Sequence, residues 1–184
     1  MRIVGIDYSM TCPAITIHDT NNFFQFSNCQ CFYLCSKLPN TSLPNIHSTK
    51  LLDFDDNESR FDHIASWAMN CIGPDDDITV YLEGYAMGAK GLVFNIAENT
   101  AILKHNLWRR GITISVVPPT VIKKFGFGKG NAKKEQMYEA FFKETQVPLM
   151  KMYQPKAKKV GSPVGDLVDS YFICKYGYEA MINM

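Results

Sequence analysis

Residues 2–9 read RIVGIDYS, an apolar run rich in β-branched side chains that ends at the carboxylate of Asp7. Residues 78–83, ITVYLE, follow the same plan and end at Glu83. Short apolar runs of this kind are typical of strands buried inside a sheet. Because strand ends converge at the ligand-binding edge of an open α/β sheet, the pattern predicts that Asp7 and Glu83 lie close together.

The other segments predict a sheet covered by helices. Residues 14–19 and 23–33 extend the first strand into an antiparallel meander, and the Pro-, Asn- and Ser-rich stretch 36–57 predicts a loop or insertion. The further expected elements are a helix at 58–72, a long helix from a glycine-bounded turn at 84–91 to about residue 111, a strand at 112–117, helices at 119–125 and 132–145, a basic loop at 148–163, and a last helix at 164–182. We therefore expect an α/β fold, a five-stranded mixed sheet flanked by helices, in one domain over residues 1–184.

Length and composition fit a single soluble domain. The chain has 184 residues, of which 46% are hydrophobic, enough to bury a core. Its first residues reach a charge too early for a secretory signal, and no apolar run approaches the roughly 20 residues of a membrane helix. The sequence predicts a cytoplasmic protein, in the host cytoplasm if its source is viral, with no membrane partner and no small-molecule cofactor.

The cysteines predict reduced thiols. Cys29, Cys31 and Cys35 cluster, but they lack the paired C-x₂-C spacing of a structural zinc site and no histidine completes the set nearby. In a chain without a secretory signal, buried thiols are favoured over disulfides.

Charge is unevenly distributed although the net charge is only +1. Acidic residues gather at 53–62 and 75–77, whereas lysines gather in the last third of the chain. An uneven field of this kind can hold a phosphate backbone, and solvated helix faces are the alternative interpretation.

Two more acids join Asp7 and Glu83 as candidate ligands. Asp166 and Asp169 are three residues apart at the start of the last helix, so they project from one face. Several buried carboxylates need cations to neutralise them, and all-oxygen ligation suits Mg²⁺, with Mn²⁺ as a substitute. Two such ions can activate water and stabilise the leaving oxygen in phosphodiester hydrolysis. Each acid also has a plain alternative: a favourable charge at a helix N-terminus, a turn residue or a surface acid.

At these residues the sequence resembles a known family. The stretches 5–9 (GIDYS), 82–85 (LEGY) and 163–169 (PVGDLVD) are similar to the RNase H-like superfamily, and in particular to the RuvC-type Holliday junction resolvases and their phage-encoded relatives. The most specific match is 119–137, which resembles the family stretch P-x-x-V-K…G-x-G-x-A-x-K-x-Q-[VM]. The resemblance spans nearly the whole chain and suggests a viral or otherwise divergent member.

The resemblance implies roles for basic and aromatic residues. Its DNA-contacting lysines, close to the scissile phosphate, fall on Lys123 and Lys134. We add four neighbouring DNA-binding candidates and one alternative base contact: Lys129, Lys133, Tyr85 and Lys90, with Met87 as the alternative to Tyr85. A ring beside the metal site could stack on an unpaired base, and the lysines would hold phosphates.

The resemblance also implies a mechanism. A homodimer with two sites would nick two opposed strands of a four-way DNA junction symmetrically and leave 5′-phosphate ends. The apolar helix at about 91–110 would form much of the dimer interface, with an ordinary buried helix as the alternative. Leu167, Val168 and Ser170 stand where the family often has alanines, and no histidine follows Asp169 closely. Of the four acids, Asp169 is therefore the one at which the sequence departs most from the family pattern.

Two other functions fit the same residues. One is an RNase H-type or structure-selective nuclease that acts on other branched or hybrid nucleic acids. The other is a catalytically silent protein that binds junctions.

Overall fold

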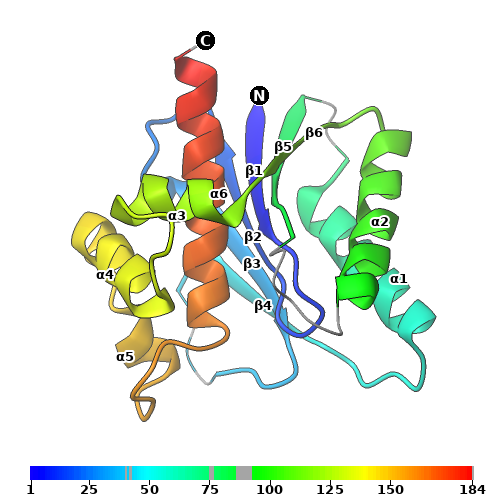
Figure 1. Cartoon of the computed structure of the whole chain (residues 1–184), viewed down its shortest axis with the longest axis horizontal. Coiled ribbons are helices and arrows are strands. Elements are labelled where there is room, and N and C mark those ends of the chain that lie inside the picture. The colour runs from blue at the N-terminus through cyan, green and yellow to red at the C-terminus, as the bar shows by residue number, and fades with distance from the viewer. Residues whose placement is uncertain (40, 42, 75–76, 86–92, 184) are drawn as a thin grey trace.

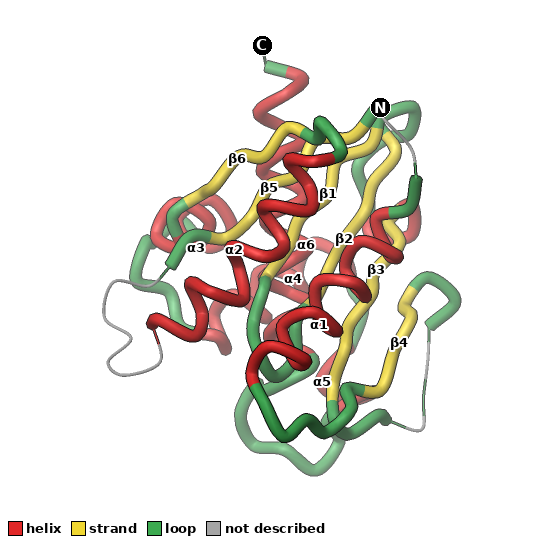
Figure 2. The backbone as a smooth tube through the Cα atoms, turned by 90° about the vertical axis from the view of Figure 1, so that its right-hand side faces the viewer, coloured by secondary structure: helices red, strands yellow, loops and turns green. Residues whose placement is uncertain are grey.

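One mixed sheet with helices on both faces makes up the fold (Figures 1 and 2). The computed structural model describes residues 1–39, 41, 43–74, 77–85 and 93–183. The strands in these ranges are β1 (Arg2–Asp7), β2 (Ala14–Asp19), β3 (Cys29–Cys35), β4 (Ile46–Lys50), β5 (Ile78–Glu83) and β6 (Thr113–Val117). The helices are α1 (Asn57–Ile72), α2 (Val93–Arg109), α3 (Pro119–Phe127), α4 (Lys134–Thr145), α5 (Leu149–Tyr153) and α6 (Val164–Ile182), with a 3₁₀ turn at Phe26–Asn28.

The sheet order is β4-β3-β2-β1-β5-β6. β1 pairs antiparallel with β2 and β2 with β3, which is the expected meander, whereas β5 runs parallel to β1 and β6 parallel to β5. β1 and β5 therefore lie side by side near the middle of the sheet, and their carboxyl ends point the same way. The parallel pairing follows from the helical crossovers that connect these strands.

The two sheet faces carry separate cores. α1 and α2 cover one face, with Ile64, Leu103 and Leu107 fully buried against the strands. α3, α4, α5 and α6 cover the other face, where α6 crosses β1 and β2 (Figure 1). The α6 face is rich in aromatic contacts, including the edge-to-face pair of Phe141 and Tyr171 at 5.1 Å between ring centroids.

Some expected elements differ from the observed ones. The described part of the chain has six strands rather than five, because residues 46–50, expected within a loop, form β4 parallel to β3. Only the first residue of β4 is buried, so this edge strand has no alternating apolar signal. Residues 23–28 are not strand; β3 begins at Cys29. The basic loop also contains the short helix α5.

All six cysteines are free thiols, as expected. In the described ranges, each helix is too short or too polar to span a bilayer.

Candidate active site

The first half of the site is built by two neighbouring strands. Ile6 of β1 is paired with Leu82 of β5, so Asp7 and Glu83 follow side by side at the carboxyl ends of parallel strands. This confirms the prediction from the two apolar runs that Asp7 and Glu83 lie close together. Both side chains are partly buried.

The second half comes from α6, which is held unusually close to β1. A side chain on Gly5 would overlap the backbone of Cys174 and the carbonyl of Ser170, so only glycine lets the helix approach the strand at this point. The first turns of α6 therefore reach the carboxyl end of β1 and carry Asp166 and Asp169 with them. Asp166 is only 5% exposed.

The four acids are close enough to perturb one another. Burial raises the pKa of Asp7 well above its ordinary value, and the charges of Asp169, Glu83 and Asp166 raise it further. Burial and Asp169 raise the pKa of Glu83 to about 7. Burial and Asp166 raise the pKa of Asp169 to about 6, although nearby lysines oppose the shift. Carboxylates brought together away from water hold protons unless a cation replaces them.

Lys134 forms an ion pair with one of these acids. Its Nζ lies 3.9 Å from an Asp166 carboxylate oxygen, although half of the lysine side chain is exposed. Burial alone would lower the pKa of Lys134, but attraction to Asp166, Asp169, Asp7 and Glu83 raises it overall. Lys134 therefore faces all four acids.

The donor set suits a hard divalent cation. Among the described residues, no group of three or more His, Cys, Asp or Glu side chains is arranged so that it could hold a metal ion as it stands. Asp166 nevertheless has a buried Oδ2 with no hydrogen-bond partner in the described part of the chain, a costly condition that an ion would relieve. Oxygen donors alone favour Mg²⁺ or Mn²⁺ over zinc.

The expected DNA-binding residues fall at different distances from the acids. Lys123 on α3 is half-buried, and its charge lowers the pKa of both Glu83 and Asp169, so it also faces the cluster. Lys129 and Lys133 are exposed around the connection between α3 and α4. Lys90 and Met87 lie outside the described residues.

Tyr85 borders a cavity beside the acids. The cavity holds about 300 Å³ and is lined by Asp7, Glu83, Tyr85 and residues of the β1–β2 connection and α2. The Tyr85 ring is 38% exposed, and Lys104 Nζ lies 5.8 Å from its centroid. No pattern in the sequence predicts this cavity, because its far wall comes from Ile96 and Thr100 on α2, far along the chain from Asp7.

A thiol pair near the acids was also missed. Cys12 and Cys35 come close where the β2–β3 pairing is extended by the hydrogen bond from Leu34 N–H to the Pro13 carbonyl, 3.0 Å. The neighbouring Cys12 thiol lowers the pKa of Cys35 to about 6. The sequence grouped Cys35 with Cys29 and Cys31, because the partner across the sheet depends on strand register.

No family model matches the sequence, and no curated protein matches it significantly. Solved structures do. RuvC of Thermus thermophilus aligns with 100% of this chain and 97% of its own, with a TM-score of 0.60 at 14% sequence identity. T. thermophilus RuvC in complex with Holliday junction substrate gives a TM-score of 0.58 at 14% identity, covering 100% of this chain and 96% of its own.

A viral protein gives a similar match. Fowlpox virus resolvase, crystallised with substrate Holliday junction DNA, aligns over 99% of both chains with a TM-score of 0.55 at 16% identity. The chain therefore has the fold of the Holliday junction resolvases RuvC and fowlpox virus resolvase, the RNase H-like fold that its sequence motifs predict.

Proposed function

We propose that the chain is a divalent-metal-dependent endonuclease that resolves four-way DNA junctions by paired symmetric nicks and leaves 5′-phosphate ends. The observation that carries the proposal is the meeting of four carboxylates, from two strand ends and one helix, around Lys134. The likeness to junction-bound resolvases supports the choice of substrate.

The acids would hold two Mg²⁺ ions, or Mn²⁺ in their place. Asp7, with the other three acids around it, would hold the ions together with Glu83, Asp166 and Asp169. Bound ions would supply an activated water and charge stabilisation for in-line hydrolysis. Lys134 and Lys123 add positive charge where the scissile phosphate approaches, and Tyr85 offers a face for a base at the crossover.

A cleavage assay tests the proposal directly. Purified protein with Mg²⁺ is expected to nick a fixed four-way junction at symmetric positions and to spare linear duplex of the same sequence. Equal cutting of an RNA–DNA hybrid would favour an RNase H-type nuclease. Junction binding in Ca²⁺ without product in Mg²⁺ or Mn²⁺ would indicate a silent junction-binding protein.

Substitution of an exposed lysine tests the electrostatic part of DNA binding separately from the cleavage step. Lys129→Ala, at an exposed site between α3 and α4, is expected to weaken junction binding by a few-fold and to reduce the salt dependence of the affinity by about one counterion. Binding titrations from 50 to 200 mM salt measure this slope. Lys50→Ala, on the far edge strand β4, is the matched control, and an unchanged slope for Lys129→Ala would remove this lysine from the DNA surface.

We also propose that α2 pairs with α2 of a second copy. On the solvent side of α2, Phe94 is 75% exposed and Trp108 is 70% exposed, an unfavourable arrangement for a solvated helix. Phe94 lies seven residues before the exposed Ala101, and Trp108 lies seven residues after it. An antiparallel pair with its two-fold axis at Ala101 would place Phe94 of each copy against Trp108 of the other, with small residues at the crossing.

This arrangement predicts which substitution dissociates the dimer. Ala101→Arg places two like charges at the two-fold axis and is expected to raise the dimer dissociation constant at least about 100-fold. Analytical ultracentrifugation measures the change. Phe23→Ala removes an apolar side chain that is 87% exposed elsewhere and is expected to leave the dimer intact. A dimer that survives Ala101→Arg would exclude the α2 pairing.

A further inference from the structure

Lys134 reaches the acids because α4 is fixed against α6. Lys134 is the first residue of α4, and Asp166 is in the first turn of α6. The contact between them therefore places the N-terminal ends of the two helices next to each other. Nothing in the sequence of α4 alone directs Lys134 toward the acids. Its direction depends on how α4 is rotated, because each residue turns the helix by about 100°.

The first point of fixation is Gly165, the residue before Asp166. A Cβ placed on Gly165 would lie 3.1 Å from Nζ and 3.3 Å from Cδ of Lys134. The lysine chain therefore lies across the helix backbone in the space that the missing side chain leaves. Gly165 is buried in the first turn of α6, where glycine offers no backbone advantage over alanine. Its small size is the property that this contact requires.

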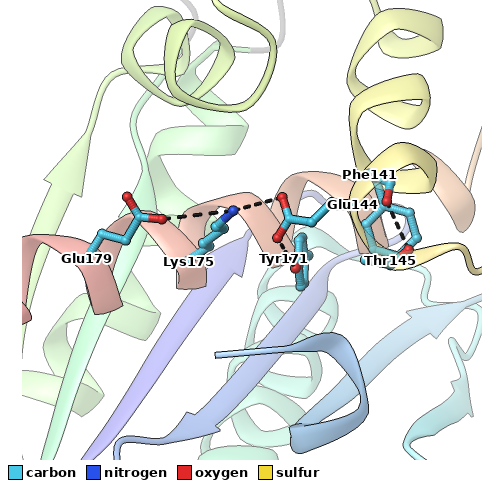
Figure 3. Close-up of polar contacts among 6 residues, drawn as sticks. All are labelled: Phe141, Glu144, Thr145, Tyr171, Lys175 and Glu179. Atoms are coloured by element: carbon cyan, nitrogen blue, oxygen red, sulfur yellow. Dashed lines mark hydrogen bonds and ion pairs between the residues drawn. The ribbon is translucent and has the colours of Figure 1, made fainter. Parts of the chain in front are cut away.

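The second point of fixation lies at the other end of α4 (Figure 3). The Tyr171 hydroxyl donates to Glu144 Oε1 at 2.6 Å, and Lys175 Nζ lies 2.7 Å from Glu144 Oε2. Both partners belong to α6, and both bonds are charge-assisted and thus stronger than neutral ones. Lys175 also lies 3.9 Å from Glu179, but that contact stays within α6.

We infer that Gly165 and Glu144 are positioning residues for Lys134: Gly165 provides the groove in which its side chain lies, and Glu144 fixes the rotation and register of α4 on α6. The consequence for catalysis rests on the proposed function. The placement of Lys134 against the acids does not, and it can be measured without any substrate.

The first experiment measures thermal stability in EDTA at pH 8. Lys134→Met removes the cation that faces four acids and is expected to lower the melting temperature by about 2–4 °C. Gly165→Ala leaves the fold intact, since the added methyl meets a flexible side chain, but it pushes the lysine side chain outward by a few tenths of an ångström. In the Gly165→Ala background, Lys134→Met is therefore expected to lower the melting temperature by less than in the unmodified protein.

Matched controls accompany this double-mutant cycle of Lys134→Met and Gly165→Ala. Lys133→Met, one residue earlier and exposed, is expected to show the same effect with and without Gly165→Ala. Glu144→Gln, which weakens the link to α6, is expected to reduce the effect of Lys134→Met, whereas Glu179→Gln is expected to leave it unchanged. Additive effects of Lys134→Met and Gly165→Ala would overturn the inference.

The second experiment repeats the cycle with junction cleavage in Mg²⁺. Lys134→Met is expected to slow cleavage about 100-fold, and Gly165→Ala and Glu144→Gln at least about tenfold each. If Gly165 and Glu144 were merely structural, replacing either of them would slow cleavage by the Lys134→Met protein further. Positioning predicts no further loss when either change is added to Lys134→Met.

The two experiments fail independently. Coupling in the melting temperatures without cleavage by the unmodified protein would refute the proposed nuclease and leave the inference standing. Cleavage with additive losses in both cycles would refute the inference and leave the nuclease standing.

Discussion

Replacing Asp7 with Asn is expected to slow junction cleavage about 10³-fold or more while leaving junction binding in Ca²⁺ within a few-fold. Asp7 is the acid whose pKa responds to all three other carboxylates, so it lies at the centre of the cluster. Asparagine preserves the shape of the side chain and removes the negative charge that would hold the proposed ions. Single-turnover cleavage rates and binding isotherms on one junction measure both quantities.

Asp77→Asn is the matched control. Asp77 precedes the opposite end of β5, where its carboxylate lies 2.9 Å from the N-terminal amine and is 75% exposed. This variant is expected to cleave at the unmodified rate. If the Asp7→Asn protein kept its cleavage activity, the assignment of the four acids as the catalytic centre would be wrong.

The stability of the metal-free protein is expected to fall as the pH rises from about 4 to about 8. The pKa of Glu83 is about 7 and that of Asp169 about 6 in the folded chain, and the pKa of Asp7 is also raised, whereas unfolded carboxyls titrate near 4. The folded state therefore binds more protons than the unfolded state in this window, and stability declines until the pH exceeds the folded values. The expected decrease in melting temperature is about 5–10 °C.

Divalent cations are expected to reverse this loss at the alkaline end. Mg²⁺ binds the deprotonated acids, so it should raise the melting temperature at pH 8 far more than at pH 5. Calorimetric melting with EDTA and with Mg²⁺ across this range measures both effects. Asp7→Asn removes one titrating group and is expected to flatten both profiles; a profile in EDTA that rises with pH would contradict the charge arrangement.

The sequence was sufficient to predict a residue's position where that position depends only on the segment that contains the residue. The apolar runs that end at Asp7 and Glu83 define buried strands, and parallel pairing then brings the two acids together. The acids of α6 follow from their spacing on one helix face. Strand β4 was missed because four of its five residues are exposed and the strand pairs only at the sheet edge.

The roles that sequence could not resolve depend on how distant segments pack. Lys134 was predicted to contact DNA from a motif, but its place against the four acids is set by the packing of α4 on α6. The same applies to the Cys12–Cys35 pair, which requires the register of β2 and β3.

The close approach at Gly5 gives the opening motif a double meaning. Asp7 is a proposed metal ligand, whereas Gly5 sets a distance, because it alone lets α6 pack on β1 with its acids over the strand end. A single residue, Ile6, separates the two, and their loss is expected to have different effects. Without the aspartate the protein keeps its shape and loses the proposed activity, and without the glycine the acids separate. A short glycine–aspartate motif thus specifies the spacing between helix and strand as well as a candidate ligand.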